Sequence, residues 1–109
     1  DPPFRPSQPE SVQRFREGLL RTDPKGYAAC CHAVAGVDWL DRLGEIRCPT
    51  LVIAGAQDVS TPVAMAQQIA ERIAGATLEV VEGAAHLSVV EQPAAFEKAV
   101  RGLLATARA

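Results

Sequence analysis

The sequence has little of what marks membrane, secreted or nucleic-acid-binding proteins. Its 109 residues contain no apolar run that approaches the ~20 residues of a membrane-spanning helix. The polar, proline-rich amino terminus is unlike a signal peptide. The formal net charge is −2 and the eleven Lys and Arg residues are dispersed, which argues against nucleic-acid and anionic-membrane partners. We therefore expect no membrane association and a cytoplasmic location.

Cysteine is also scarce, and its spacing matches no metal site. Cys30, Cys31 and Cys48 are an odd set that forms no disulfide framework, as in proteins of reducing compartments. No Cys-x-x-Cys pair occurs, and adjacent residues of a helix point about 100° apart. We therefore expect no metal and no cofactor, and we interpret Cys30 and Cys31 as small residues buried in a helix. His32 is expected to be structural or exposed.

Two strand-like runs organise the carboxyl-terminal half. Residues 50–55 (TLVIAG) are apolar after the first position, as in a strand buried on both faces of a parallel sheet, and residues 76–82 (ATLEVVE) predict a second strand. Residues 62–74 are predicted to form a helix between them, with Thr61 as the N-cap and Gly75 as the stop. Such a unit returns right-handed, so the two strands should lie side by side. The predicted fold class is therefore α/β.

Each predicted strand is followed by a titratable side chain. Asp58 comes three residues after the first strand, and His86 follows the second strand across Gly83, Ala84 and Ala85. The carboxyl ends of parallel strands meet at one edge of the sheet, where α/β proteins bind ligands. A carboxylate on one imidazole nitrogen sets the tautomer while the other nitrogen transfers a proton. Asp58 and His86 are therefore the candidate catalytic pair, although Asp58 alone also fits an Asx turn.

Helices are predicted before this strand–helix–strand unit. Residues 1–10 hold four of the eight prolines and predict an irregular lead-in. Residues 11–22 show helical spacing of apolar side chains, with Ser11 as a possible N-cap. Asp23 is suited to cap a second helix that ends near Gly36.

The remaining elements are a short connection and a closing helix. Residues 38–43 predict a short helix or turn that brings Trp39, the only tryptophan, to the core. Pro93 suits the first turn of the last helix. That helix is predicted to bury one stripe against the sheet, formed by Phe96, Val100, Leu103 and Leu104.

Two segments resemble the carboxyl-terminal part of the α/β-hydrolases. TLVIAGAQDVSTP resembles the acid loop of that family and GAAHLSVVEQP its histidine loop, in the chain order nucleophile, acid, histidine. DPKGYAACCHAV, followed by VDWLDRLGEIRCPTLVIAG, resembles the 3-oxoadipate enol-lactonases more specifically. The resemblance implies a partial helical cap at residues 1–47, and the last two parallel strands and helices of the core at residues 48–109. An ordinary αα-hairpin is the alternative for the helical segment.

The resemblance also implies a hydrolase with only part of its active site in this chain. Asp58 and His86 would be the acid and the histidine of a Ser-His-Asp triad, yet none of the four serines lies in a Gly-x-Ser-x-Gly elbow. The missing amino-terminal half of the hydrolase domain would supply the serine and the oxyanion hole. Trp39 and Leu87 are candidate substrate-binding residues. One cap cation would meet the substrate carboxylate: Arg16, Arg21 or Lys25.

The expected function is hydrolysis of 3-oxoadipate enol-lactone in aromatic-compound degradation, with this chain inactive alone. The same acid and histidine loops would also serve an esterase, a carbon–carbon bond hydrolase or a cofactor-free haloperoxidase. A non-catalytic fragment that binds a protein partner is the alternative from a different class. A Gly-x-Ser-x-Gly elbow in the upstream reading frame would favour the enzyme.

Overall fold

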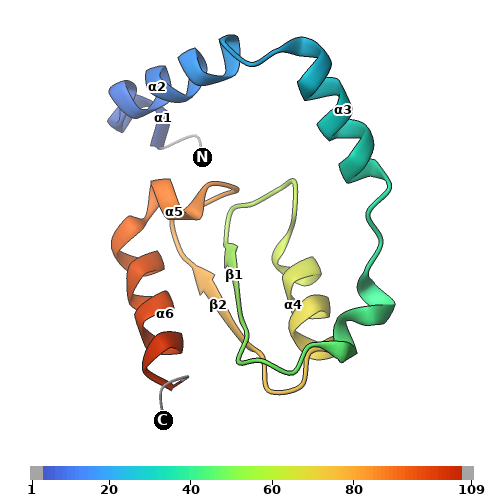
Figure 1. The fold of residues 1–109 in the computed structure, drawn as a ribbon. Coiled ribbons are helices and arrows are strands. Elements are labelled where there is room, and N and C mark those ends of the chain that lie inside the picture. The colour runs from blue at the N-terminus through green and yellow to red at the C-terminus, as the bar shows by residue number, and fades with distance from the viewer. Residues whose placement is uncertain (1–3, 107–109) are drawn as a thin grey trace. The chain divides into compact units, whose positions relative to one another are not determined.

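The structure is a computed structural model that describes residues 4–106. These residues form two compact units, residues 4–39 and residues 40–106. The first unit is entirely helical, and the second combines helices with a two-stranded sheet (Figure 1). No helix within residues 4–106 has the length and the apolar character that crossing a membrane requires.

Three helices make up the first unit: α1 (Phe4–Ser7), α2 (Pro9–Leu20) and α3 (Pro24–Ala35). The prediction of an irregular lead-in is wrong for residues 4–10, which form α1 and the first turn of α2; residues 1–3 lie outside the described residues. Pro9 occupies the first helical position, where its missing N–H has no helical partner to lose. The N-cap is therefore Gln8, and Ser11 lies inside the helix.

Helix α3 has the boundaries predicted for a helix capped by Asp23 and ending near Gly36, but its predicted burial is wrong. The Asp23 carboxylate caps α3 by accepting from the Gly26 N–H at 2.8 Å, and Gly36 is the C-cap. Cys30 and Cys31 are exposed, however, as is every other residue of α3. The reason is that α2 and α3 do not pack along each other, so the small side chains of α3 have nothing to bury against in their own unit (Figure 1).

The second unit contains one 3₁₀-helix, two strands and three α-helices: η1 (Leu40–Glu45), β1 (Leu51–Gly55), α4 (Val63–Arg72), β2 (Thr77–Val81), α5 (Ser88–Glu91) and α6 (Pro93–Thr106). The short helix expected at residues 38–43 is η1, shifted toward the carboxyl terminus. Trp39 precedes it and is 54% exposed, so the prediction that this side chain packs into the core is wrong. It falls at the end of the first unit, whose residues bury no side chain fully.

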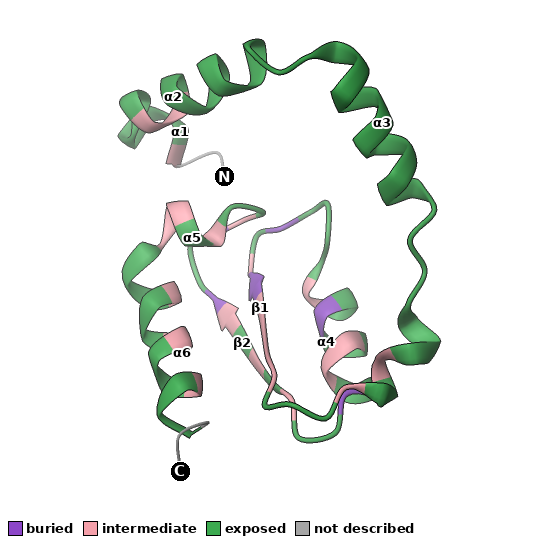
Figure 2. Cartoon of the chain, viewed as in Figure 1, coloured by how far each residue is buried: buried purple, intermediate pink, exposed green. Residues whose placement is uncertain are grey.

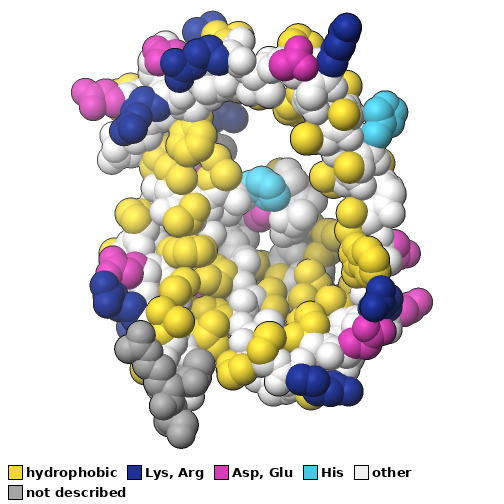
Figure 3. Space-filling model, viewed as in Figure 1, with side chains coloured by type: hydrophobic (Ala, Val, Ile, Leu, Met, Phe, Trp, Pro, Cys, Tyr) yellow, Lys and Arg dark blue, Asp and Glu magenta, His cyan; other side chains and the backbone are white. Residues whose placement is uncertain are grey.

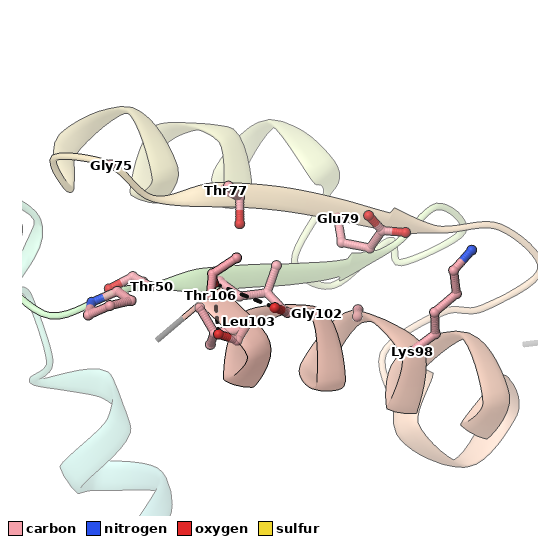
Figure 4. A pocket seen from close by; sticks show the side chains of 11 residues that line it. Thr50, Gly75, Thr77, Glu79, Lys98, Gly102, Leu103 and Thr106 are labelled. Carbon is pink, nitrogen blue, oxygen red and sulfur yellow. Dashed lines mark hydrogen bonds between the residues drawn. The ribbon is translucent and has the colours of Figure 1, made fainter. Parts of the chain in front are cut away.

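The two strands pair in parallel, as predicted, in a register that runs from Leu51 opposite Thr77 to Gly55 opposite Val81. Helix α4 covers one face of this sheet and α6 covers the other (Figure 4). Only the last two residues of β1 are buried, and its first three are half-buried (Figure 2). The expectation of a strand buried along its whole length is therefore met only where β1 approaches the histidine loop. The buried apolar residues are few and mostly small: Ala54, Ala66, Ile73, Val81 and Ala84.

Helix α4 starts and stops differently from its predicted bounds. The N-cap is Pro62, which makes no side-chain capping bond, and the helix begins at Val63. Thr61 does not cap because its hydroxyl donates to Asp58 instead, at 2.6 Å. The helix ends at Arg72, and Gly75 serves the turn into β2 with a φ of 75°, a conformation that favours glycine.

Helix α6 begins at Pro93, as predicted. Phe96, Val100 and Leu103 are half-buried against the sheet, but Leu104 is exposed, so its predicted burial is wrong. One step of about 100° turns Leu104 away from the stripe that Leu103 occupies. Apolar side chains therefore remain visible over α6 on the molecular surface (Figure 3).

Candidate active site

The parallel pairing of β1 and β2 brings Asp58 and His86 together, although 28 residues separate them in the chain. Each lies in the loop that follows the carboxyl end of its strand, and Gly55 and Val81, the last residues of the two strands, are register partners. The Oδ2 atom of Asp58 lies 2.8 Å from the Nδ1 atom of His86. The structure thus forms the carboxylate–imidazole contact that a catalytic pair needs.

All the acceptor capacity of the Asp58 carboxylate is used. Its Oδ1 atom accepts from the backbone N–H of Ser60 at 2.8 Å and of Thr61 at 3.0 Å. Its Oδ2 atom accepts from the Thr61 hydroxyl at 2.6 Å and contacts His86. The Asx-turn interpretation and the pairing with histidine are therefore both correct for the same side chain.

Burial and hydrogen bonding act on the ionisation of Asp58 in opposite directions. Burial raises the pKa of this carboxyl group because it penalises the charged form. The hydrogen bonds from Thr61, His86 and Ser60 outweigh that effect and hold the pKa of Asp58 far below its usual value. Asp58 is therefore ionised at neutral pH, and an ionised carboxylate only accepts hydrogen bonds.

The charge of Asp58 decides which imidazole nitrogen carries the proton. Because the carboxylate only accepts, the Nδ1 atom of His86 must donate to it. In the neutral ring the Nε2 atom is then left with its lone pair, which is the state of a general base. The side chain of Asp58 is 6% exposed and that of His86 is 62% exposed, so the carboxylate is shielded while the imidazole is open to a reaction partner.

Backbone contacts join the acid loop to the histidine loop. The N–H of Ala56 donates to the Val81 carbonyl at 3.0 Å, and the N–H of Gln57 donates to the Ala84 carbonyl at 2.9 Å. Gly55 makes this approach possible, because a Cβ atom there would lie 2.6 Å from the Ala84 carbonyl oxygen. The distance between Asp58 and His86 is therefore set by two loops that are bonded to each other.

Thr61 is a site residue that the sequence predicted for a different task. Besides its bond to Asp58, its hydroxyl oxygen lies 3.3 Å from the Nδ1 atom of His86. The D-x-x-T spacing marks both an Asx turn and a helix N-cap, and the sequence offers no signal that separates the two. Glu91 was also not predicted: its carboxylate accepts from the Ala85 N–H at 2.5 Å, from the one-turn helix α5.

The predicted substrate-binding residues belong to different units of the fold. Leu87 follows His86 directly and is partly exposed at the start of α5. Trp39 belongs to the other unit, as do the three candidate cations Arg16, Arg21 and Lys25, which are exposed. Their roles in substrate binding stay predictions.

A groove of about 480 Å³ lies elsewhere, between the sheet and α6 (Figure 4). Its walls include Leu51 and Thr77, which are the first residues of β1 and β2, and Glu79 and Lys98 face it from the sheet and from α6. It therefore lies toward the opposite end of the strands from Asp58 and His86. Within residues 4–106, no three His, Cys, Asp or Glu side chains are grouped so that they could hold a metal ion.

Known proteins similar to this chain are hydrolases. Residues 28–109 match the family described as TAP-like protein. The 3-oxoadipate enol-lactonase 2 of Acinetobacter baylyi is 46% identical over 103 residues, which are 94% of this chain and 38% of that protein. The crystal structure of the enol-lactonase from Burkholderia xenovorans matches 94% of this chain and 39% of its own, with a TM-score of 0.90 and 31% identity. A hydrolase from Pseudomonas aeruginosa matches 93% of this chain and 39% of its own, with a TM-score of 0.84 and 44% identity.

These matches cover most of this chain but a minor part of each relative. The chain spans less than two fifths of the length of the enol-lactonases that it resembles. The family match begins at residue 28, in the first unit, and continues through the second unit, so it includes residues of both units.

Proposed function

Because this chain belongs to the α/β-hydrolases, in the family described as TAP-like protein, we propose that it carries the acid and the base of a Ser-His-Asp triad. Asp58 is the acid and His86 is the base, and the serine comes from the amino-terminal half of the hydrolase domain. The observation that carries the proposal is the 2.8 Å contact between the Asp58 Oδ2 and His86 Nδ1 atoms at the carboxyl ends of two parallel strands.

The residues of this chain would act on protons rather than on carbon. The Nε2 atom of His86 takes the proton of the attacking serine and gives it to the leaving enol oxygen as the lactone C–O bond breaks. It then takes a proton from the water that hydrolyses the acyl-enzyme, and returns that proton to the serine oxygen as the acyl–serine bond breaks. Asp58 keeps the Nδ1 proton of His86 in place and stabilises the imidazolium that forms in each step. Its four hydrogen-bond contacts hold the carboxylate still, so the ring needs no reorientation during the reaction.

The proposed substrate is an enol-lactone, with 3-oxoadipate enol-lactone as the specific candidate. Its support is the 46% identity to a protein of that name, together with the structural likeness to a second enol-lactonase. Attack on the ring carbonyl opens the lactone to an acyl-enzyme that carries an enol in the same molecule. The enol tautomerises to the ketone, and hydrolysis of the acyl-enzyme frees the keto acid. We propose that Leu87 and Trp39 contact this substrate, and that Arg16, Arg21 or Lys25 meets its free carboxylate.

Replacement of the proposed base tests this function in a complete enzyme that includes these 109 residues, either as part of one chain or together with a second chain that supplies the serine. His86→Ala should lower kcat for 3-oxoadipate enol-lactone by roughly 10⁴- to 10⁶-fold, because no other group takes the serine proton. KM should change little, since the lost interaction belongs to the transition state. The measurement is steady-state kinetics, with circular dichroism to show that the variant is folded.

His32→Ala is the matched control, because His32 is the only other histidine of the chain and is exposed on α3. It should keep the parental kcat. The proposal fails if folded His86→Ala keeps more than about a tenth of the parental kcat, a loss far smaller than that of a triad member. If the enzyme hydrolysed a simple alkyl ester faster than the lactone, the triad assignment would stand but the proposed substrate would be wrong.

A further inference from the structure

A single peptide unit, the one that joins Ala84 to Ala85, connects the acid loop to the histidine. Its carbonyl oxygen accepts from the Gln57 N–H at 2.9 Å, next to Asp58. Its N–H donates to the Glu91 Oε2 atom at 2.5 Å, next to His86. The same peptide therefore has one end bonded to the loop of the acid and the other end bonded to a carboxylate that follows the histidine by five positions.

We infer that Glu91 is a positioning residue that holds His86 at Asp58 by anchoring this peptide. A hydrogen bond from an amide to a carboxylate is about twice as strong as one between neutral groups. It also polarises the peptide, which makes the carbonyl of Ala84 a better acceptor for Gln57. Glu91 thus strengthens a bond between the two loops that is made by the Gln57 N–H and the Ala84 carbonyl.

Other contacts also fix the position of the Ala84–Ala85 peptide. We call the bonds from this peptide to Glu91 and to Gln57 the clamp. Gly55 leaves no Cβ atom in the space that this peptide occupies. Ala84 is buried. The side chain of Gln92, the neighbour of Glu91, donates from its Nε2 atom to the Gly83 carbonyl at 3.2 Å, so two consecutive residues hold the histidine loop. Gly83 has a φ of 70°, a turn conformation that favours glycine at this point.

The inference rests on the proposed function only in calling His86 the group to be positioned, so its test does not use turnover. Hydrogen exchange of the Gln57 and Ala85 amides is measured by NMR in the complete enzyme and in its Glu91→Ala variant. The clamp predicts that both amides exchange about tenfold faster in the variant, including that of Gln57, whose N–H is bonded to the Ala84 carbonyl and not to Glu91. The ratio of Nδ1-protonated to Nε2-protonated neutral His86, read from its ring ¹⁵N shifts, should fall about five- to tenfold.

Two further variants decide the outcome. Glu91→Gln keeps an acceptor without the charge, so both effects should be smaller than in Glu91→Ala. Glu82→Ala removes an exposed carboxylate at the end of β2 and should leave both amides and the tautomer ratio unchanged. Unchanged exchange at Gln57 in a folded Glu91→Ala variant overturns the inference; if that variant does not fold, unchanged exchange at both amides in Glu91→Gln overturns it. If His86→Ala did not lower kcat, the proposed function would be wrong, but the hydrogen-exchange and tautomer results would still stand. The two proposals can therefore fail separately.

Discussion

Asp58 is the residue on which the local structure converges. A buried carboxylate is unfavourable unless its charge is compensated, and here every lone-pair direction is used by a donor from the same loop or by His86. Three of those four contacts come from Ser60 and Thr61, within three residues of Asp58. The carboxylate is therefore oriented mainly by its own loop.

Asp58→Asn should separate orientation from charge. In the complete enzyme, the amide can still accept from the acid loop and keep the fold, but it permits the wrong imidazole tautomer and cannot stabilise an imidazolium. We expect kcat to fall by roughly 10³- to 10⁴-fold with KM nearly unchanged. Steady-state kinetics measure the effect, and Asp41→Asn in the exposed helix η1 is the control. A folded Asp58→Asn variant with more than about a tenth of parental kcat would show that Asp58 is not the acid.

The lowered pKa of Asp58 also predicts how acid affects stability. The carboxyl is charged more readily in the folded protein than in the unfolded chain, whose pKa is near the ordinary 3.8. Its contribution is therefore fully present above that value and is lost as the pH falls below it, toward the folded pKa. In urea unfolding between about pH 5 and about pH 2, the loss of stability should be shallower in Asp58→Asn than in the parent.

Thr61→Val provides a graded comparison for this pH effect. It removes the hydroxyl that bonds the Asp58 Oδ2 atom but leaves the backbone bonds to the Oδ1 atom. Its pH dependence should lie between those of the parent and Asp58→Asn. Equal slopes in all three proteins would mean that these hydrogen bonds do not couple the ionisation of Asp58 to folding.

At the scale of elements, the strand–helix–strand unit places the acid loop and the histidine loop at one edge of the sheet. The close approach of β1 to the histidine loop then fixes the distance between the two loops. Parallel strands joined through α4 place their carboxyl ends together. This close approach requires glycine as the last residue of β1, because the backbone of Ala84 and Ala85 occupies the space that a side chain of residue 55 would need.

Gly55→Ala should force these elements apart. The new Cβ atom would collide with backbone atoms of Ala84 and Ala85, which cannot move without breaking the Gln57–Ala84 bond. We expect the free energy of unfolding to fall by about 1–3 kcal/mol. Gly102→Ala in α6 is the matched control: its Cβ meets nothing within 4 Å, so alanine should be neutral or stabilise the helix by about 0.5–1 kcal/mol. Urea denaturation distinguishes them, and equal stability of the two variants would contradict the close approach.

At the scale of the whole chain, apolar surface is left without cover. Phe15, Leu19 and Leu20 of α2 are exposed, and the sheet has only two strands. A two-stranded sheet is marginal in water even with one helix on each face, and its free edges can pair with other strands. We therefore expect these 109 residues, expressed alone, to associate or unfold and to lack lactonase activity, since no serine elbow is present.

Sedimentation velocity over a range of concentrations tests this expectation. Leu20→Lys should reduce association by placing a charge on the apolar face of α2, whereas Gln67→Lys on the exposed side of α4 adds the same charge and should not. A compact monomer that unfolds reversibly, at every concentration and in both variants, would contradict the prediction.

The sequence by itself determined the parallel strand–helix–strand unit and its family, because unbroken apolar runs, strand-end polar residues and two loop motifs are all local signals; the family match and the parallel register confirm them. It also predicted that Asp58 and His86 would be neighbours. Which contacts hold them there was decided only by the tertiary structure. Thr61 has two possible partners, an acid and a helix end, and the choice depends on where Asp58 lies.

The burial of the helices could not be read from their sequences either. Helical spacing predicted burial of Leu104, and Cys30 and Cys31 were expected to be buried as small residues of a helix. Burial requires a partner surface, however, and in their own units none covers them. Glu91 lies on a helix of one turn, which is too short for a periodic pattern, so only its distance to the Ala85 amide identifies it. Local patterns predict what a segment can do, whereas these contacts join residues whose meeting is fixed by the paths of two strands and their loops.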